Sequence, residues 1–213
     1  MEDRKRFNQK SNRIFKRKMK SKLIETLRKN RDLITIFTKR EIESRYKGSF
    51  LGIMWSIVNP LLMLSVYTLV FSKIFKSRWG NLGTEGFDDP TQFAVNLFAG
   101  LIVFNIFAEC ANKGPYLISS NPNYIKKVVF PVEILGIATA GSALFHGIIS
   151  LLILIGIRIL NGEGVSLSVM VLPILWGSYI IGITGMCWIL SLIGALIKDI
   201  GQIMGSIVSI MMF

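Results

Sequence analysis

Few residues in this sequence have the types and spacing that catalysis or metal binding requires. The lone histidine, His146, stands in a long apolar stretch, and the two cysteines, Cys110 and Cys187, lack metal-ligand spacing. A phosphate-binding loop needs the pattern G-x-x-x-x-G-K-[ST], and the sequence contains no Gly-Lys pair. We therefore expect no catalytic residue, metal site or bound cofactor in this chain. If the protein performs energised transport, another polypeptide must bind the ATP and its magnesium.

Polar and aromatic residues recur at helical spacing within the apolar stretches. Such residues usually face a bundle interior or a wet cavity, and aromatic rings beside amides would suit a passing sugar chain. Hydrogen bonding between helices is the alternative, and we favour it for Thr139, Ser142, His146 and Ser150. Glu109 could instead be hydrated or paired with an Arg or Lys from the predicted interface helix, 31–47. The candidates for a pore are Trp55, Asn59, Tyr67, Phe98, Asn105 and Glu109.

Uncharged stretches of membrane-spanning length carry these residues. The chain is 51% hydrophobic with a mean hydropathy of +0.51, and a bilayer core of about 30 Å needs roughly 20 apolar residues per helix. We predict an all-α membrane protein, a polytopic helical bundle. Its complete spans are expected at about 51–72, 92–111, 133–157 and 169–196. A last apolar run, 200–213, is too short to cross, so we expect an incomplete fifth span of a longer protein.

Charge is concentrated at the N-terminus. Residues 1–50 hold 17 of the 25 Lys and Arg, and their net charge is +11. With the N-terminus in the cytoplasm, the inner segments carry 21 Lys and Arg and the outer ones 4, as the positive-inside rule requires. Membrane lipid therefore explains the basic head better than nucleic acid does. We divide the chain into a basic cytoplasmic segment (1–30), an amphipathic interface helix (31–47) and a transmembrane domain (48–213).

The predicted interface helix has an apolar side containing Leu33, Ile34 and Phe37. Such a helix lies in the membrane interface with its apolar side toward the lipid. The alternative is a basic anchor that only sets the topology. The candidate functional residues of this helix are Arg40, Glu41, Arg45, Tyr46 and Lys47.

The inner loop 112–131 contains a second candidate element, a short helix over 122–129. Asn121 can cap it, Pro122 suits its first turn, and Pro131 would end it. A short helix at the membrane face can dock into a groove of a soluble partner, although an ordinary basic loop explains the residues equally well. The candidate docking residues are Asn121, Pro122, Asn123, Tyr124, Ile125, Lys126 and Lys127.

Two motifs give a resemblance to a known family. The first is R-Y-K-x-S-x-L-G-x-x-W followed by N-P-L, at Arg45, Tyr46, Lys47, Ser49, Leu51, Gly52, Trp55, Asn59, Pro60 and Leu61. The second is the stretch 121–127 followed by Phe130 and Pro131. Both resemble the membrane subunit of bacterial polysaccharide ABC exporters, which move O-antigen, capsule or teichoic acid. The resemblance covers roughly residue 30 to the end, and residues 1–30 match nothing that we can name.

The resemblance implies a subunit with six spans, of which two copies form one pore. Each copy would pair with a separate ATPase, which would dock on the 122–129 helix and near the interface helix. The substrate would be a lipid-linked polysaccharide and the location the bacterial cytoplasmic (inner) membrane, with an outer gate and sixth span beyond Phe213. Two alternatives remain open: an ABC exporter of a drug or lipid, and a non-transporting anchor of a glycan-synthesis complex.

Overall fold

The computed structural model describes residues 28–70, 90–125, 130–160, 162, 164 and 167–212. Within these residues all regular secondary structure is helical, which confirms the predicted all-α class. The predicted docking residues Lys126 and Lys127 lie outside the described residues. The elements are α2 (Arg31–Tyr46), η1 (Gly52–Met54), α3 (Trp55–Val70), α5 (Pro90–Lys113), η3 (Gly114–Tyr116), α6 (Pro122–Ile125), α7 (Glu133–Leu160), η4 (Leu167–Val171), α8 (Leu172–Leu196) and α9 (Ile200–Met211).

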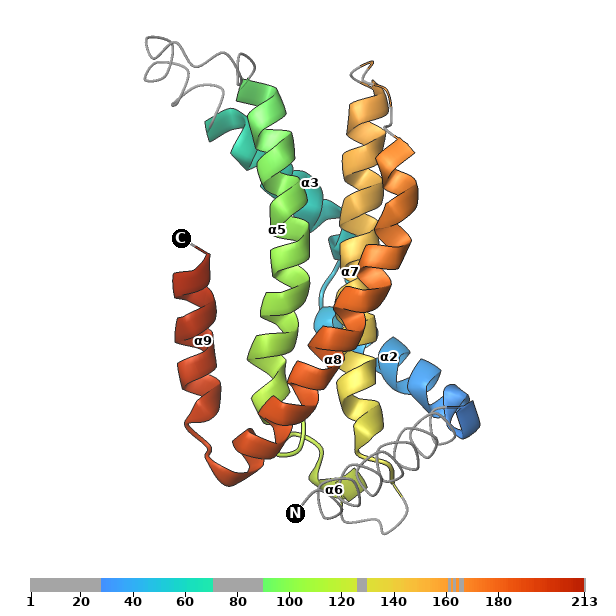
Figure 1. Ribbon diagram of the computed structural model, residues 1–213, viewed down its shortest axis with the longest axis vertical. Coiled ribbons are helices and arrows are strands. Elements are labelled where there is room, and N and C mark those ends of the chain that lie inside the picture. Colours follow the sequence, from blue (N-terminus) through green and yellow to red (C-terminus); the bar gives the residue numbers. More distant parts are fainter. Residues whose placement is uncertain are drawn as a thin grey trace, which may run out of the picture.

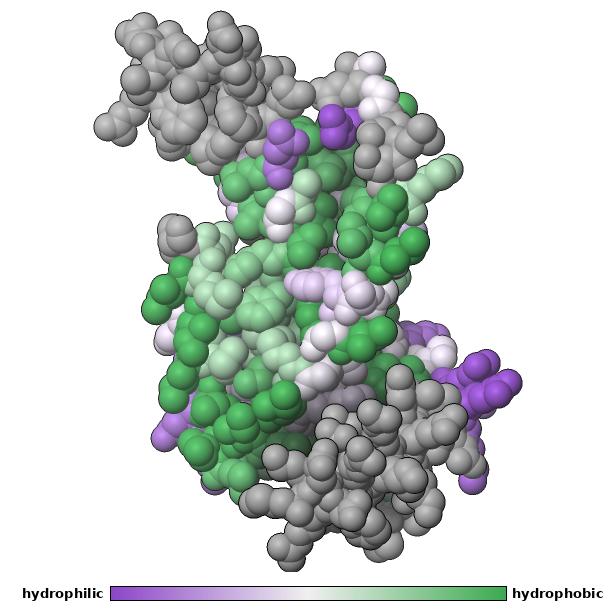
Figure 2. All heavy atoms as spheres, viewed as in Figure 1, coloured by the Kyte–Doolittle hydropathy of each residue, from purple (hydrophilic) through white to green (hydrophobic). Residues whose placement is uncertain are grey.

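Four helical segments are long and apolar enough to cross a membrane. They are Gly52–Val70, Ala94–Tyr116, Glu133–Leu160 and Val169–Leu196. Figure 2 shows apolar side chains along the length of the helices, with hydrophilic ones on α2 and near the two ends of the bundle. The chain is therefore a multi-pass membrane protein, and the shorter apolar helix Ile200–Met211 follows the fourth span.

α5 is central to the bundle because it packs against α3, α7, α8 and α9 (Figure 1). One apolar cluster joins Phe98 and Ile102 of α5 to Leu64 of α3 and Leu154 of α7. A second cluster joins Ile106 and Cys110 of α5 to residues of α2, α7 and α8. Burial of apolar side chains between helices thus fixes the spans relative to one another.

α2 packs mainly against α7 and extends away from it at an angle to the spans (Figure 1). Gly141 of α7 leaves room for Thr38, whose methyl carbon would lie 3.1 Å from a Cβ at that glycine. Phe37 is 8% exposed in the same contact region. The predicted apolar side of the interface helix is therefore partly covered by protein.

Close backbone approaches occur near one end of the bundle. A Cβ at Gly194 of α8 would overlap the carbonyl oxygen of Pro115 in η3, and one at Gly201 of α9 would overlap the ring of Tyr116. These two glycines allow η3 to fit between α8 and α9, which hold it through tight steric contact.

Candidate functional site

The structure brings the two predicted cytoplasmic elements together. Arg40 of α2 donates a hydrogen bond from Nη1 to the Tyr124 hydroxyl of α6 at 2.6 Å, although the two residues are 84 positions apart. The Arg40 guanidinium carbon also lies 5.3 Å from the centre of the Tyr124 ring. Arginine therefore binds Tyr124 through both its hydroxyl and its aromatic face.

Three aromatic rings surround this contact. Phe37 of α2 lies 5.2 Å from Tyr124 of α6 and 5.2 Å from Phe130, measured between ring centres. Tyr124 and Phe130 are 5.4 Å apart. Because Phe130 leads into α7, the cluster joins α2, α6 and the start of α7 in one apolar contact.

A chain of alternating charges joins α2 to α5. Glu109 of α5 accepts hydrogen bonds from Arg45 Nη1 at 2.8 Å and from Lys113 Nζ at 3.1 Å, each on a different carboxylate oxygen. Lys113 also lies 3.5 Å from the Glu41 carboxylate of α2. Glu109 is therefore paired with a cation from the interface helix. This was one of the alternatives that the sequence left open.

His146 of α7 extends this network. Its Nδ1 lies 3.2 Å from Arg45 Nη1 and 3.7 Å from a Glu109 oxygen. Because arginine can only donate, Nδ1 acts as the acceptor, which places the imidazole proton on Nε2. Nε2 is buried and has no hydrogen-bond partner within the described part of the chain.

The other polar residues of α7 behave differently from the prediction of hydrogen bonds between helices. Thr139 and Ser150 each donate to a backbone carbonyl four residues earlier in α7. The Ser142 hydroxyl is buried without a partner among the described residues. The expectation was therefore wrong for Thr139 and Ser150, because the preceding turn of a helix offers a hydroxyl a nearer acceptor than a neighbouring helix does.

The end of α2 completes the contact with α7. The Tyr46 ring packs on His146 with 5.7 Å between ring centres, and Lys47, which follows it, is exposed. Burial raises the pKa of the Tyr46 hydroxyl, an effect that Arg45 opposes and Glu109 reinforces. Tyr46 therefore stays protonated at neutral pH and contributes a packed ring rather than a charge.

The predicted pore residues fall into three groups. Asn59 of α3 and Asn105 of α5 are exposed, whereas Trp55, Tyr67 and Glu109 are partly buried. Phe98 is only 3% exposed and lies in the apolar cluster between α3, α5 and α7. Its ring therefore packs helices together, and it is not available to a solvent-filled passage within this arrangement.

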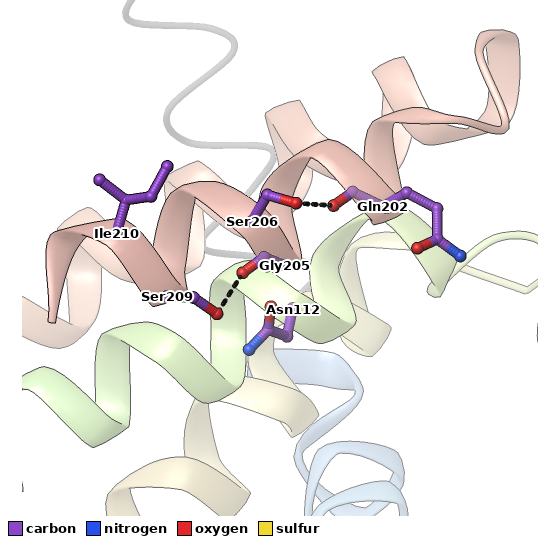
Figure 3. A pocket seen from close by; sticks show the side chains of 7 residues that line it. Asn112, Gln202, Gly205, Ser206, Ser209 and Ile210 are labelled. Atoms are coloured by element: carbon purple, nitrogen blue, oxygen red, sulfur yellow. Dashed lines mark hydrogen bonds between the residues drawn. The ribbon is translucent and has the colours of Figure 1, made fainter.

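A polar groove between α5 and α9 was missed by the sequence reasoning. It has a volume of about 630 Å³. Figure 3 shows Asn112 of α5 facing the side of α9 that carries Gly205 and Ser209. The signal was present in the sequence, because Gln202, Ser206 and Ser209 repeat at helical spacing in an apolar run. The groove is lined by Asn112, Gly201, Gln202, Gly205, Ser206, Ser209 and Ile210.

The serine hydroxyls in the groove already have acceptors. Ser206 donates to the Gln202 carbonyl at 3.3 Å and Ser209 to the Gly205 carbonyl at 2.9 Å. Their oxygens can still accept hydrogen bonds, and the Asn112 amide can donate and accept. The groove can therefore hold water or the hydroxyl groups of a polar ligand.

Comparisons with known proteins agree on membrane transporters. Residues 32–213 match the family described as ABC-2 type transporter. An O-antigen export system permease protein, RfbA of Myxococcus xanthus, is 24% identical over 192 residues, covering 90% of this chain and 70% of the relative. Two proteins of the same name from Klebsiella pneumoniae are 26% and 28% identical and cover 79% and 71% of this chain. The chain spans 61% and 52% of the lengths of those two relatives.

Proposed function

This chain belongs to the ABC-2 type transporter family, and we propose that it is the membrane-spanning channel subunit of an ATP-driven exporter of lipid-linked polysaccharide. The similarity to proteins named O-antigen export permeases supports this cargo. Two copies would enclose the channel in a bacterial cytoplasmic membrane with their N-termini in the cytoplasm. Each copy would bind a separate ATPase subunit, which would supply ATP and its magnesium.

The contact between α2 and α6 supports this proposal most directly. An ATPase partner needs a docking element whose position is linked to the spans. α6 is such an element, because the bond from Arg40 to Tyr124 and the ring of Phe37 tie it to α2. Pro122 and Asn123 of α6 are exposed and available to a partner.

The groove between α5 and α9 supports a polar pathway. A stripe of serine, asparagine and glutamine on an otherwise apolar helix of a membrane protein is costly unless it faces water, another polar surface or a ligand. Asn105 lies seven residues before Asn112, so it continues the same face of α5 by two turns and is itself exposed. Hydroxyl and amide groups along this face would suit the hydroxyl groups of a passing glycan.

The first prediction tests docking. In the complex reconstituted with its ATPase, the double change Tyr124→Ala with Lys126→Ala should reduce export per ATP hydrolysed by about tenfold, within the usual range of coupling between sites. Insertion into the membrane should stay intact, which protease mapping would check. Tyr124→Phe keeps the ring between Phe37 and Phe130 but removes the hydroxyl that Arg40 bonds, so any loss in this variant measures that bond alone.

Unchanged export by the alanine variant would remove the docking role of α6. Failure of the wild-type chain to copurify with an ATPase or to stimulate ATP hydrolysis would point instead to a non-transporting anchor. Export of a drug or lipid in place of a glycan would keep the architecture and overturn the proposed cargo.

A further inference from the structure

Glu109 is a carboxylate inside a membrane-spanning segment. It lies within Ala94–Tyr116 and its side chain is 11% exposed. An ionised group at such a position is costly unless other charges and hydrogen bonds compensate it. Arg45 and Lys113 provide this compensation at 2.8 and 3.1 Å, so α2 and α5 each hold one cation beside Glu109.

The cations come from both sides of a helix–helix contact. Arg45 belongs to α2, whereas Lys113 belongs to α5 and also reaches Glu41 of α2 at 3.5 Å. Glu41 and Arg45 are four residues apart and therefore lie on one side of α2. The four groups carry two positive and two negative charges in alternation, so the network is neutral and joins α2 to α5 at two points.

The same helix also holds α6. Arg40 bonds to Tyr124, and Arg40 directly precedes Glu41 within the 16-residue helix α2. α2 thus connects the docking helix to α5 through Glu109 and to α7 through His146. Glu109 is only 11% exposed, whereas Arg45 and Lys113 are 44% and 36% exposed. Charged hydrogen bonds to a largely buried carboxylate are directional, so they can transmit a displacement that a purely apolar contact would absorb by sliding.

We propose that Glu109 is a positioning residue that fixes α2, and with it α6, in one orientation relative to α5 and α7. Movement of the ATPase at α6 is then passed through α2 to the second and third spans. This inference rests on the proposed function for its ATPase, but the anchoring of α2 by Glu109 stands on the contacts of this chain alone. An element that couples the ATPase to the spans must stay attached to both of them in each state of the ATPase.

Amide hydrogen exchange of the purified chain in lipid nanodiscs tests the anchoring without an ATPase. Glu109→Gln keeps the shape of the side chain but leaves one acceptor oxygen for two cations. The loss of a charged hydrogen bond should make local opening of α2 easier. We therefore expect the amides of residues 31–46 to exchange about tenfold faster in this variant. Glu109→Asp keeps both acceptor oxygens and should exchange like the wild type.

Glu43→Gln is the matched control on the same helix. It breaks the ion pair of Glu43 with Lys39, whose atoms are 3.8 Å apart and whose side chains are 75% and 62% exposed. Exposed ion pairs of this kind contribute little to stability. Amide hydrogen exchange of residues 31–46 should therefore be the same as in the wild type. Equal exchange in the Glu109→Gln variant and the wild type would overturn the proposal.

Export by the complete complex tests the transmission. With Glu109→Gln we expect the ATPase to bind and hydrolyse ATP, while export per ATP falls about tenfold; Glu109→Asp should recover most of it. Faster exchange combined with normal export would overturn transmission through Glu109. If the wild-type complex does not export at all, the proposed function fails, and the exchange result alone then decides whether Glu109 anchors α2.

Discussion

Single glycines decide how closely the helices at one end of the bundle can approach. Gly194 of α8 is buried, and its position leaves no room for a side chain beside the Pro115 carbonyl. Gly182 lies on the same helix, and a Cβ there would meet nothing within 4 Å in this chain. The two residues therefore offer a matched pair on one helix, one in tight contact and one in open space.

We predict that Gly194→Ala destabilises the protein by about 1–3 kcal/mol, the usual cost of overpacking. The added methyl group meets a backbone carbonyl, which cannot move without displacing η3. Gly182→Ala should be neutral or stabilising by up to about 1 kcal/mol, because alanine favours the helix. Thermal unfolding of the purified protein in detergent would measure both, and equal melting temperatures for the two variants would contradict the prediction.

The helices α2, α8 and α9 present different kinds of surface. α2 combines buried aromatic contacts with ion pairs, whereas α8 presents many exposed apolar side chains suited to lipid, such as Ile174, Ile181 and Leu192. α9 has a polar side toward α5 and an apolar side that includes Ile203 and Ile207. An amphipathic helix within a membrane protein indicates that its polar side faces a protected polar space.

The polar side of α9 gives a prediction at this scale. Ser206→Leu with Ser209→Leu would fill the groove with apolar side chains and remove acceptors for glycan hydroxyls. We expect export to fall by about tenfold, equivalent to about 1.4 kcal/mol, with normal insertion. Ile203→Leu is the control, because it introduces leucine on the other side of α9. Export by the reconstituted complex is the measurement, and equal loss in both variants would contradict a polar path beside α9.

At the scale of the whole molecule, the charge distribution predicts one orientation. Ser119 precedes α6, whereas Gly164 follows α7, and both are exposed. α7 has 28 residues, so at about 1.5 Å per residue its two ends lie on opposite sides of a bilayer core. The proposed attachment of an ATPase requires Ser119 to be cytoplasmic.

Cysteine labelling tests this orientation. In intact cells an impermeant thiol reagent should label a Gly164→Cys variant and spare a Ser119→Cys variant, which should react only after permeabilisation. The native Cys110 and Cys187 are fully buried, so the background should be low. Labelling of the Ser119→Cys variant from outside would exclude cytoplasmic docking at α6.

Much of this architecture was determined by the sequence. Uncharged stretches of sufficient length can satisfy their backbone in lipid only as helices, so the four spans and the all-α class followed from hydropathy and length. The interface helix and the short helix at Pro122 were predicted from local signals, namely apolar periodicity, a capping residue and a proline at the first turn. These are properties of neighbouring residues, which a sequence records directly.

The tertiary structure decided which distant residues meet. The sequence does not show that Arg40 binds Tyr124, which cation of the interface helix pairs with Glu109, or that Phe98 is buried while Asn105 is exposed. Among the glycines that the structure describes, the tightest contacts are at Gly194 and Gly201, which the sequence alone does not distinguish from the other glycines. The physical reason is that in lipid hydrophobicity does not distinguish one side of a helix from another, so packing and a few polar bonds fix the partners of each span.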